Sequence, residues 1–89
     1  MILAKVVGNL WATRKDEKLN GLKLMVCQRR LQEEVYDDKL IVAADNAGAG
    51  VGDHVLITTG SSARISFARD NIPADMVIVG IIDKVDFAE

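Results

Sequence analysis

The expected fold follows mainly from the longest apolar run of the chain, which is Met76-Val77-Ile78-Val79-Gly80-Ile81-Ile82. Valine and isoleucine are stiff at the first side-chain torsion and favour pleated strands. The segment stays apolar on both faces until Asp83, and strands of that kind are usually buried on both sides. We therefore expect a strand from Met76 to about Val85 that turns one face to the core and the other to a second subunit.

Four more strand-like segments precede this run, separated by turn signals. The first alternates apolar and mixed positions, and Gly8 interrupts it, which indicates a bulge or bend. The second follows the turn signal Asn20-Gly21 and places Leu22, Leu24 and Val26 on one face. The expected strands are Ile2 to Ala12, Leu22 to Leu31, Leu40 to Asp45 and His54 to Thr59, with the charged segment from Gln32 to Lys39 as a loop.

A short helix is expected between the fourth and fifth strands. Ser61 or Ser62 can N-cap it, because a serine hydroxyl satisfies amide groups of the first turn. This helix would run to about Arg69, and the segment Asp70-Asn71-Ile72-Pro73 ends it. Five short strands with one helix predict an all-β domain, folded as a small closed or partly closed barrel.

Length and composition indicate one domain, spanning residues 1–89, that gains stability from other subunits. With 89 residues, such a domain buries only about 60–65% of the surface that its unfolded chain exposes. Cys27 has no second cysteine to pair with, and one cysteine plus the single histidine do not make a structural zinc site. Since 49% of residues are hydrophobic but only 4% aromatic, the core is aliphatic and oligomerisation is the expected support.

Charge and hydropathy argue against several classes of protein. The net charge of −2 lacks the basic excess of a domain that binds nucleic acid through phosphates. The segment Met1-Ile2-Leu3-Ala4-Lys5 has no pattern of a secretory signal, and the longest apolar run is far shorter than the ~20 residues of a membrane span. The lone thiol of Cys27 fits a reducing cytosol. We expect a cytoplasmic protein without membrane or nucleic-acid partners.

The glycine-rich segment Asp45-Asn46-Ala47-Gly48-Ala49-Gly50-Val51-Gly52-Asp53 is the first candidate site. A dinucleotide fingerprint requires G-x-G-x-x-G between a strand and a helix, whereas this segment has G-x-G-x-G and a strand follows it. The Gly-Lys-Ser/Thr of a P-loop is absent as well. The favoured interpretation is a tight turn in which glycines permit positive φ and close backbone approach, including that of a neighbouring subunit.

The segment Gly60-Ser61-Ser62-Ala63-Arg64 is the second candidate. A nucleophilic serine needs an adjacent base and an orienting acid, but His54 is the only histidine and no G-x-S-x-G elbow is present. Helix capping, with Arg64 paired to Asp75 or Asp83, is the favoured interpretation. We therefore expect no catalytic residue, no cofactor and no bound metal.

Three polar or aromatic features keep a structural interpretation. His54 is expected on a partly exposed strand face, and the acidic pairs Glu33-Glu34 and Asp37-Asp38 as solvated loop charge. Trp11 lies on the mixed face of the first strand. Because tryptophan is enriched at the centres of interfaces, two interpretations stay open for Trp11, an interface anchor and a core residue.

The residues quoted above resemble the EutN/CcmL family of bacterial microcompartment vertex proteins. The resemblance follows the family's order and spacing over nearly the whole chain. The matching segments are Leu3-Ala4-Lys5-Val6-Val7-Gly8, Gly21-Leu22-Lys23-Leu24, Asp45 to Gly52, Gly60 to Arg64, and Asp75 to Asp83.

This resemblance implies a five-stranded, OB-like β-barrel that forms a homopentamer at the five-fold vertices of a shell tiled by hexameric microcompartment shell proteins. By the same analogy, subunit contacts or the central axis would involve ten residues: Gly48, Ala49, Gly50, Gly52, Gly60, Ser61, Ser62, Arg64, Val79 and Ile81. An axial pore that conducts metabolites is compatible with this role. Two alternatives come from other classes: an OB-fold module that binds nucleic acid, for which stacking aromatics are scarce, and an enzyme, for which no catalytic constellation is visible.

Overall fold

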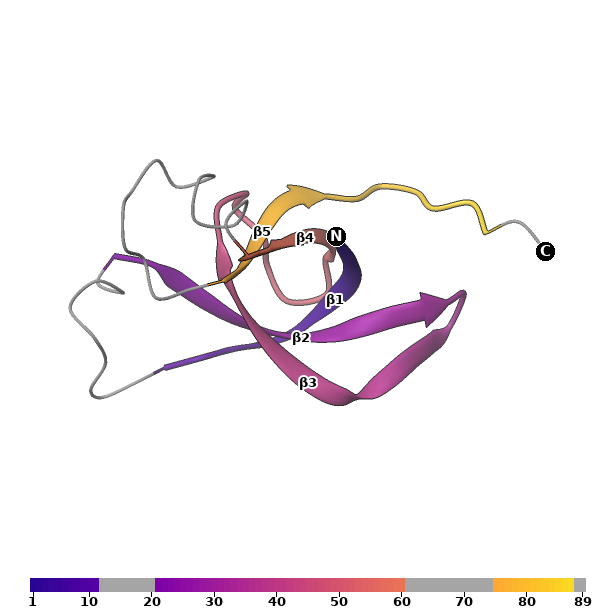
Figure 1. Ribbon diagram of the computed structural model, residues 1–89, viewed down its shortest axis with the longest axis horizontal. Coiled ribbons are helices and arrows are strands. Elements are labelled where there is room, and N and C mark those ends of the chain that lie inside the picture. The colour runs from indigo at the N-terminus through magenta and orange to yellow at the C-terminus, as the bar shows by residue number, and fades with distance from the viewer. Residues whose placement is uncertain (12–20, 61–74, 88–89) are drawn as a thin grey trace.

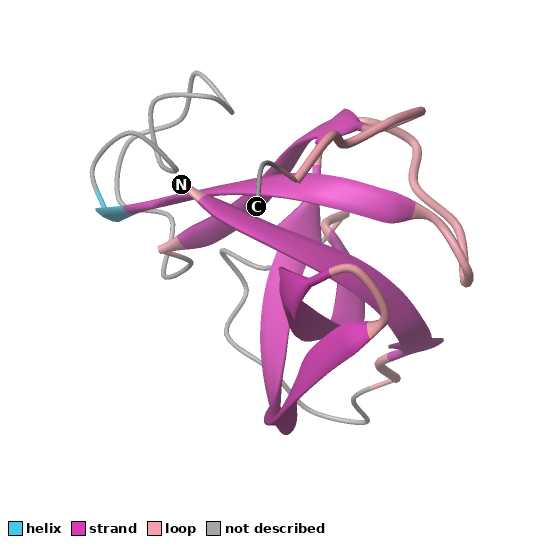
Figure 2. Cartoon of the chain, turned by 90° about the vertical axis from the view of Figure 1, so that its right-hand side faces the viewer, coloured by secondary structure: helices cyan, strands magenta, loops and turns pink. Residues whose placement is uncertain are grey.

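The computed structural model describes residues 1–11, 21–60 and 75–87, and these residues form a closed five-stranded barrel with the strand order β1-β2-β3-β5-β4 (Figure 1). Nearly all of the described chain is strand or connecting loop (Figure 2). The prediction of an all-β, five-stranded barrel is confirmed. The helix predicted from Ser61 or Ser62 to Arg69 lies outside the described residues. The strands are β1 (Ile2–Asn9), β2 (Lys23–Gln32), β3 (Val35–Asp45), β4 (His54–Thr59) and β5 (Met76–Ile81).

Antiparallel pairs make up most of the barrel. β1 pairs with β2 on one side and with β4 on the other, β2 pairs with β3, and β4 pairs with β5. The one parallel contact joins β3 to β5 through only two residue pairs, Ala44 with Val77 and Asp45 with Ile78. This parallel seam completes the ring of strands.

The interior of the barrel is filled by small and branched aliphatic side chains, as the composition predicts. Met25 and Cys27 of β2 are fully buried, and so is Ile78 of β5. They pack in one cluster with residues from every other strand and with Ala49 of the glycine loop. Burying an aliphatic side chain of this size contributes about 1.5–3 kcal/mol, so a core of so few residues leaves the domain marginal.

A second cluster lies on the opposite face of the same strands. Val77 of β5 is fully buried there against Leu22 and Ala44, and Leu24 and Val79 pack beside them. Because Val77 and Ile78 are neighbours buried on opposite faces, the two-sided apolar pattern of β5 is explained. The chain itself covers the start of the outer face, where the sequence predicts contact with a second subunit, whereas Ile81 is still 44% exposed.

The segment from Gln32 to Lys39 is not the predicted loop but lies mostly in strands. β3 begins at Val35, ten residues before Asp45 and well before the predicted start at Leu40. The turn is confined to Glu33 and Glu34, and Glu34 takes a positive φ of 58°. The resulting β2–β3 hairpin extends beyond the barrel (Figure 1). Since both faces of such an arm meet solvent, its sequence need not alternate between apolar and polar residues.

The bounds of three other strands agree with the predicted ones or differ from them by a few residues. The bulge predicted at Gly8 is confirmed by a register shift between Val6 and Gly8, and β1 ends at Asn9 rather than Ala12. β4 has its predicted bounds. β5 ends at Ile81 rather than near Val85, because the amide of Ile82 makes the last contact with β4, to the carbonyl of His54 at 2.8 Å.

Candidate functional site

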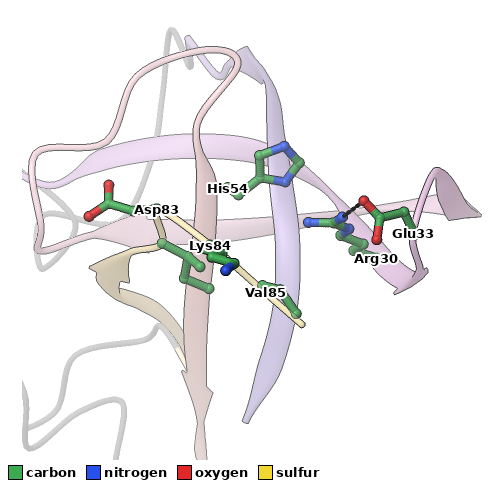
Figure 3. A pocket seen from close by; sticks show the side chains of 7 residues that line it. Arg30, Glu33, His54, Asp83, Lys84 and Val85 are labelled. Carbon is green, nitrogen blue, oxygen red and sulfur yellow. Dashed lines mark ion pairs between the residues drawn. The ribbon is translucent and has the colours of Figure 1, made fainter. Parts of the chain in front are cut away.

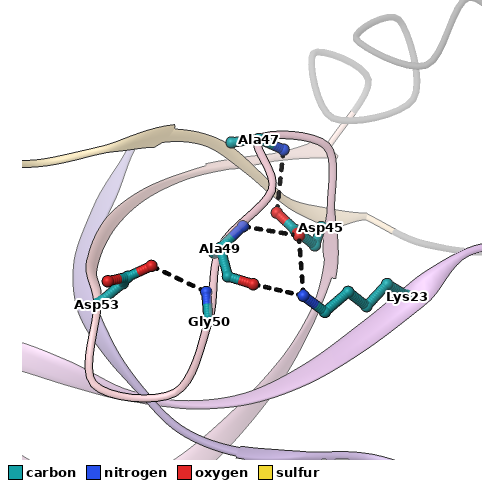
Figure 4. Close-up of polar contacts among 6 residues, drawn as sticks. All are labelled: Lys23, Asp45, Ala47, Ala49, Gly50 and Asp53. Atoms are coloured by element: carbon teal, nitrogen blue, oxygen red, sulfur yellow. Dashed lines mark hydrogen bonds and ion pairs between the residues drawn. The ribbon is translucent and has the colours of Figure 1, made fainter.

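The glycine loop joins β3 to β4, and Asp45 holds its first half (Figure 4). The Asp45 carboxylate accepts hydrogen bonds from the amides of Ala47, at 3.0 Å, and Ala49, at 2.9 Å. Lys23 lies 3.7 Å from the same carboxylate and donates to the carbonyl oxygen of Ala49. The Asp45 side chain is only 3% exposed, so the cation and the two amides compensate a buried negative charge.

The second half of the loop is held by Asp53 and by β1. The Asp53 carboxylate accepts a hydrogen bond from the amide of Gly50 at 2.8 Å. The amide of Gly52 donates to the carbonyl of Val6 at 2.9 Å, and the amide of Val6 donates to the carbonyl of Asp53. These four loop amides therefore already have acceptors within the chain, and three of them donate to carboxylates. A phosphate would have to displace negative side chains, which disfavours nucleotide binding.

The loop glycines serve the backbone conformation rather than a close contact inside the chain. Gly48 and Gly52 have φ values of 78° and 97°, which confirms the predicted positive φ at these two positions. A Cβ added at either position would meet nothing within 4 Å, whereas one at Gly50 would lie 3.8 Å from an Asp53 oxygen. Ala49 between them is fully buried in the barrel core. The loop is thus a fixed part of the barrel that leaves open space around its glycines.

The structure places seven of the ten candidate residues, and they do not form one cluster of side chains. Gly48, Gly50 and Gly52 border the loop, Gly60 follows β4 with a φ of 65°, and Ala49 is internal. Val79 is half-buried against the second cluster and Ile81 is exposed on the same strand. Ser61, Ser62 and Arg64 lie outside the described residues.

Large apolar side chains are exposed over most of the barrel. Trp11 is 88% exposed, so its interpretation as a core residue of this chain is wrong. Where such side chains lie next to one another, they are candidates for a contact with another molecule. Most of these residues are not predicted from the sequence, because strand alternation alone does not show which face a barrel turns outward. The exposed large apolar residues are Met1, Val7, Leu10, Trp11, Leu31, Val35, Leu40, Val42, Val51 and Ile81.

The described residues show little that resembles reactive chemistry. Among them, no group of three or more His, Cys, Asp or Glu side chains could hold a metal ion. Cys27 is buried, and burial, with the negative Asp45 nearby, raises the pKa of its thiol from 9.0 to about 11. A protonated, inaccessible thiol is a poor nucleophile. No helix in the described part of the chain is long and apolar enough to cross a membrane.

The fold and this surface together define a class of protein. The β-barrel has a small core, a loop whose hydrogen bonds are made within the chain, and many exposed apolar residues. These features are typical of a domain that associates with other subunits.

Comparisons with known proteins identify the family within that class. Residues 1–83 match the family model described as ethanolamine utilisation protein EutN/carboxysome. The bacterial microcompartment shell vertex protein GrpN of Rhodospirillum rubrum is 41% identical over 86 residues, which cover 97% of each chain. The carboxysome shell vertex protein CcmL of Nostoc is 42% identical over 96% of this chain and 85% of its own. The chain belongs to the EutN/CcmL family of shell vertex proteins.

The fold agrees with solved structures of the family. The pentameric microcompartment shell protein GrpN from Rhodospirillum rubrum has a TM-score of 0.87 to this chain at 39% identity, and the match covers 99% of this chain and 100% of that one. The CcmL structure from Nostoc also gives 0.87, at 42% identity over 96% and 92% of the two chains. The OB-fold module that binds nucleic acid is therefore the less favoured alternative.

Proposed function

We propose that the chain is a non-catalytic structural subunit whose pentamers cap the five-fold vertices of a bacterial microcompartment shell. The observation that carries the proposal is the match to the shell vertex family over residues 1–83, together with the likeness to a structure described as a pentameric shell protein. The geometry supplies a reason for such a unit, since a flat hexagonal layer closes only where five-fold units introduce curvature. The expected partners are hexameric shell proteins.

A cyclic pentamer needs two different surfaces on each subunit that fit one another, because a heterologous interface must close into a ring. The outer end of β5 is one proposed contact, since Ile81 is exposed at the end of a strand whose other residues are buried or half-buried. The open space around Gly48 and Gly52 supports a second contact at the glycine loop. We extend the proposed contacts to Gly50, Gly60, Ser61, Ser62, Arg64 and Val79, with Ala49 fixing the loop from inside the core.

Two features support a role without catalysis and without nucleic acid. The single cysteine is buried, and the sequence offers one histidine, His54, and no G-x-S-x-G elbow. The net charge of −2 and an aromatic content of 4% give neither the basic groove nor the stacking platform of a single-strand binder. A failure to shift any oligonucleotide at low salt would agree with this proposal.

The first experiment is the native mass of the purified protein. With a chain of 9.7 kDa, a closed ring of five has a mass of about 49 kDa. A pentamer supports the proposal. A stable monomer or dimer leaves the barrel intact but removes the physical reason to assign a five-fold vertex.

A pair of substitutions on β5 separates assembly from folding. We expect Ile81→Asp to release folded monomers, because a carboxylate at a partly exposed interface position opposes association more than it opposes folding. Ile78→Asp should instead give unfolded or insoluble protein, because Ile78 is fully buried in the barrel. The conservative Ile81→Val should keep the pentameric mass. A fully assembled Ile81→Asp protein would count against this part of the interface.

A further inference from the structure

A polar pocket opens where the end of β2, the start of β4 and the segment after β5 meet (Figure 3). It has a volume of about 250 Å³. Its lining includes none of the ten residues proposed for assembly. The lining residues are Arg30, Glu33, His54, Ile82, Asp83, Lys84 and Val85.

The segment after β5 forms one wall of the pocket and is fixed at both ends. At its start, the amide of Ile82 donates to the carbonyl of His54 at 2.8 Å. Five residues later, the Arg30 guanidinium lies over the ring of Phe87, 5.0 Å from its centroid. This cation–π contact connects the tail to the β2–β3 arm. The pocket is therefore a formed feature of the fold rather than a gap beside a loose end.

Arg30 is a mostly buried cation that makes few and long polar contacts with the described residues. Its side chain is only 10% exposed, yet its ion pair with Glu33 is long, at 3.9 Å, and Glu33 itself is 70% exposed. A guanidinium carries five N–H donors, and the Nε–H makes a long contact of 3.4 Å to the carbonyl of Gln32. Burying a charge is costly unless polar partners compensate it. The site thus has positive charge and free donors to offer.

His54 supplies the second observation. Its Nδ1 atom is buried and has no hydrogen-bond partner among the described residues. The large majority of buried polar side-chain atoms in proteins have a hydrogen-bond partner, and one left without a partner destabilises the fold. Tyr36 stacks on the imidazole with centroids 6.5 Å apart, and Lys5 lies 5.9 Å from the Tyr36 ring centroid. The ring is therefore held in place by aromatic packing, while its Nδ1 lacks a hydrogen-bond partner among the described residues.

The remaining charges agree with an anionic ligand. In Figure 3 the His54 imidazole and the Arg30 guanidinium lie on the same side of the pocket, whereas the carboxylate of Asp83 points away from them. Lys84, at the rim, is 79% exposed and pairs loosely with the equally exposed Asp86 at 3.7 Å. Loose surface pairs of this kind contribute little and exchange easily, so Lys84 can turn its ammonium to a ligand.

We propose that this pocket binds a small oxyanion, a phosphate or a carboxylate. Arg30 donates from the buried side, the Nδ1–H of His54 donates from the β4 side, and Lys84 adds positive charge at the opening. An oxyanion would satisfy the buried Nδ1 and compensate the buried guanidinium at once, as charge-assisted hydrogen bonds do. The assignment does not depend on the proposed vertex role, since every group in it comes from one chain.

His54 makes a direct test simple, because it is the only histidine of the chain. We would follow its imidazole resonances by NMR in the full-length, natively assembled protein while adding inorganic phosphate, and separately acetate, at constant ionic strength set with chloride. The expected result is a saturable shift with one or both anions. The anion that binds with the higher affinity identifies whether the pocket prefers a phosphate or a carboxylate. No shift with either anion, or a shift that rises without saturation, would overturn the proposal. A pocket that a neighbouring subunit already fills in the assembled protein would also give no shift, and this too would overturn the proposal.

Matched arginine variants distinguish a site from general charge. Arg30→Gln should weaken phosphate binding about tenfold or more, since it removes a charge-assisted contact. Arg29→Gln removes the same charge at the adjacent exposed position and should leave the affinity within about twofold. Equal losses in the two variants would show that only net charge matters and would refute the pocket. The titration of the unmodified protein remains decisive if Arg30→Gln does not fold.

Discussion

Asp45 is the residue on which the glycine loop depends. Its carboxylate accepts two loop amides from a position where the side chain is 3% exposed, and Lys23 compensates its charge. The sequence shows an acid ahead of three glycines, but it does not show that this acid is buried. An aspartate at the end of a strand more often forms a solvated turn.

We expect Asp45→Ala to lower the free energy of unfolding by about 2–4 kcal/mol, because two loop amides lose their acceptor and Lys23 loses its counter-ion. Urea denaturation at fixed protein concentration measures the change. Asp37→Ala is the matched control. Asp37 accepts a similar local hydrogen bond, from the amide of Lys39 at 3.0 Å, but at an exposed site. Asp37→Ala should therefore lower the free energy of unfolding by less than about 0.5 kcal/mol. Similar losses in both variants would contradict the role assigned to Asp45.

Cys27 makes the stability of the folded protein depend on pH in the alkaline range. Burial raises the pKa of the thiol from 9.0 to about 11 in the folded protein. Between these two values the unfolded chain releases the proton while the folded chain keeps it, so stability is present below pH 9 and is lost as the pH rises towards 11. The loss should be on the order of 2 kcal/mol.

Cys27→Ala isolates this effect, because other groups titrate in the same range. We expect the stability of the variant to be lower at pH 8 because of the cavity, but its decline from pH 9 to 11 should be shallower than that of the unmodified protein. Parallel pH profiles for the two proteins would show that Cys27 does not carry the dependence.

At the scale of the strands, the sequence predicts what local patterns determine. β4 has its predicted bounds, and the bulge lies at Gly8, because a short apolar strand and an isolated glycine are local signals. The arm of β2 and β3 could not be predicted in the same way. Asp37, Asp38 and Lys39 have the composition of a loop, and what makes them a strand is the pairing of β3 with β2, a tertiary contact.

Two glycines of the same loop give a controlled comparison of backbone requirements. Gly52→Ala should lower the free energy of unfolding by about 1–2 kcal/mol, since an alanine is strained at a φ of 97°. Gly50 has no positive φ, and a Cβ there makes only an ordinary contact at 3.8 Å. Gly50→Ala should therefore change stability by no more than about 0.5 kcal/mol.

Urea denaturation and native mass are both measured for these glycine variants, because the first reports stability and the second reports assembly. A Gly50→Ala protein of normal stability that no longer forms the pentamer would indicate that a neighbouring backbone approaches this glycine. Equal destabilisation by Gly50→Ala and Gly52→Ala would contradict the assignment of the strain to positive φ.

At the scale of the whole molecule, composition already indicates association. A chain that is 49% hydrophobic and has few residues to surround a core must leave apolar side chains outside it. Which of them point outward could not be predicted, because the closure of a barrel sets the orientation of each strand. Trp11 illustrates the limit. Its type fits a core and an interface equally, and its 88% exposure in the barrel removes the first option.

Trp11 is also a built-in reporter of assembly, as the only tryptophan of the chain. If it anchors a subunit contact, its fluorescence emission should shift to shorter wavelength in the pentamer and to longer wavelength on dilution into monomers, because assembly removes the indole from water. The Ile81→Asp monomer supplies the reference spectrum. An emission maximum that stays constant while the native mass changes would place Trp11 outside every subunit contact.

The parallel seam between β3 and β5 has a mechanical consequence. Two residue pairs close the barrel there, while the antiparallel ladders on either side are longer, and parallel pairing is slightly weaker per residue. Tension across the barrel would therefore part β3 from β5 first and leave two intact halves, β1-β2-β3 and β4-β5, hinged where β1 meets β4. A ring of five such barrels under load would yield along five equivalent lines before any of its longer ladders failed.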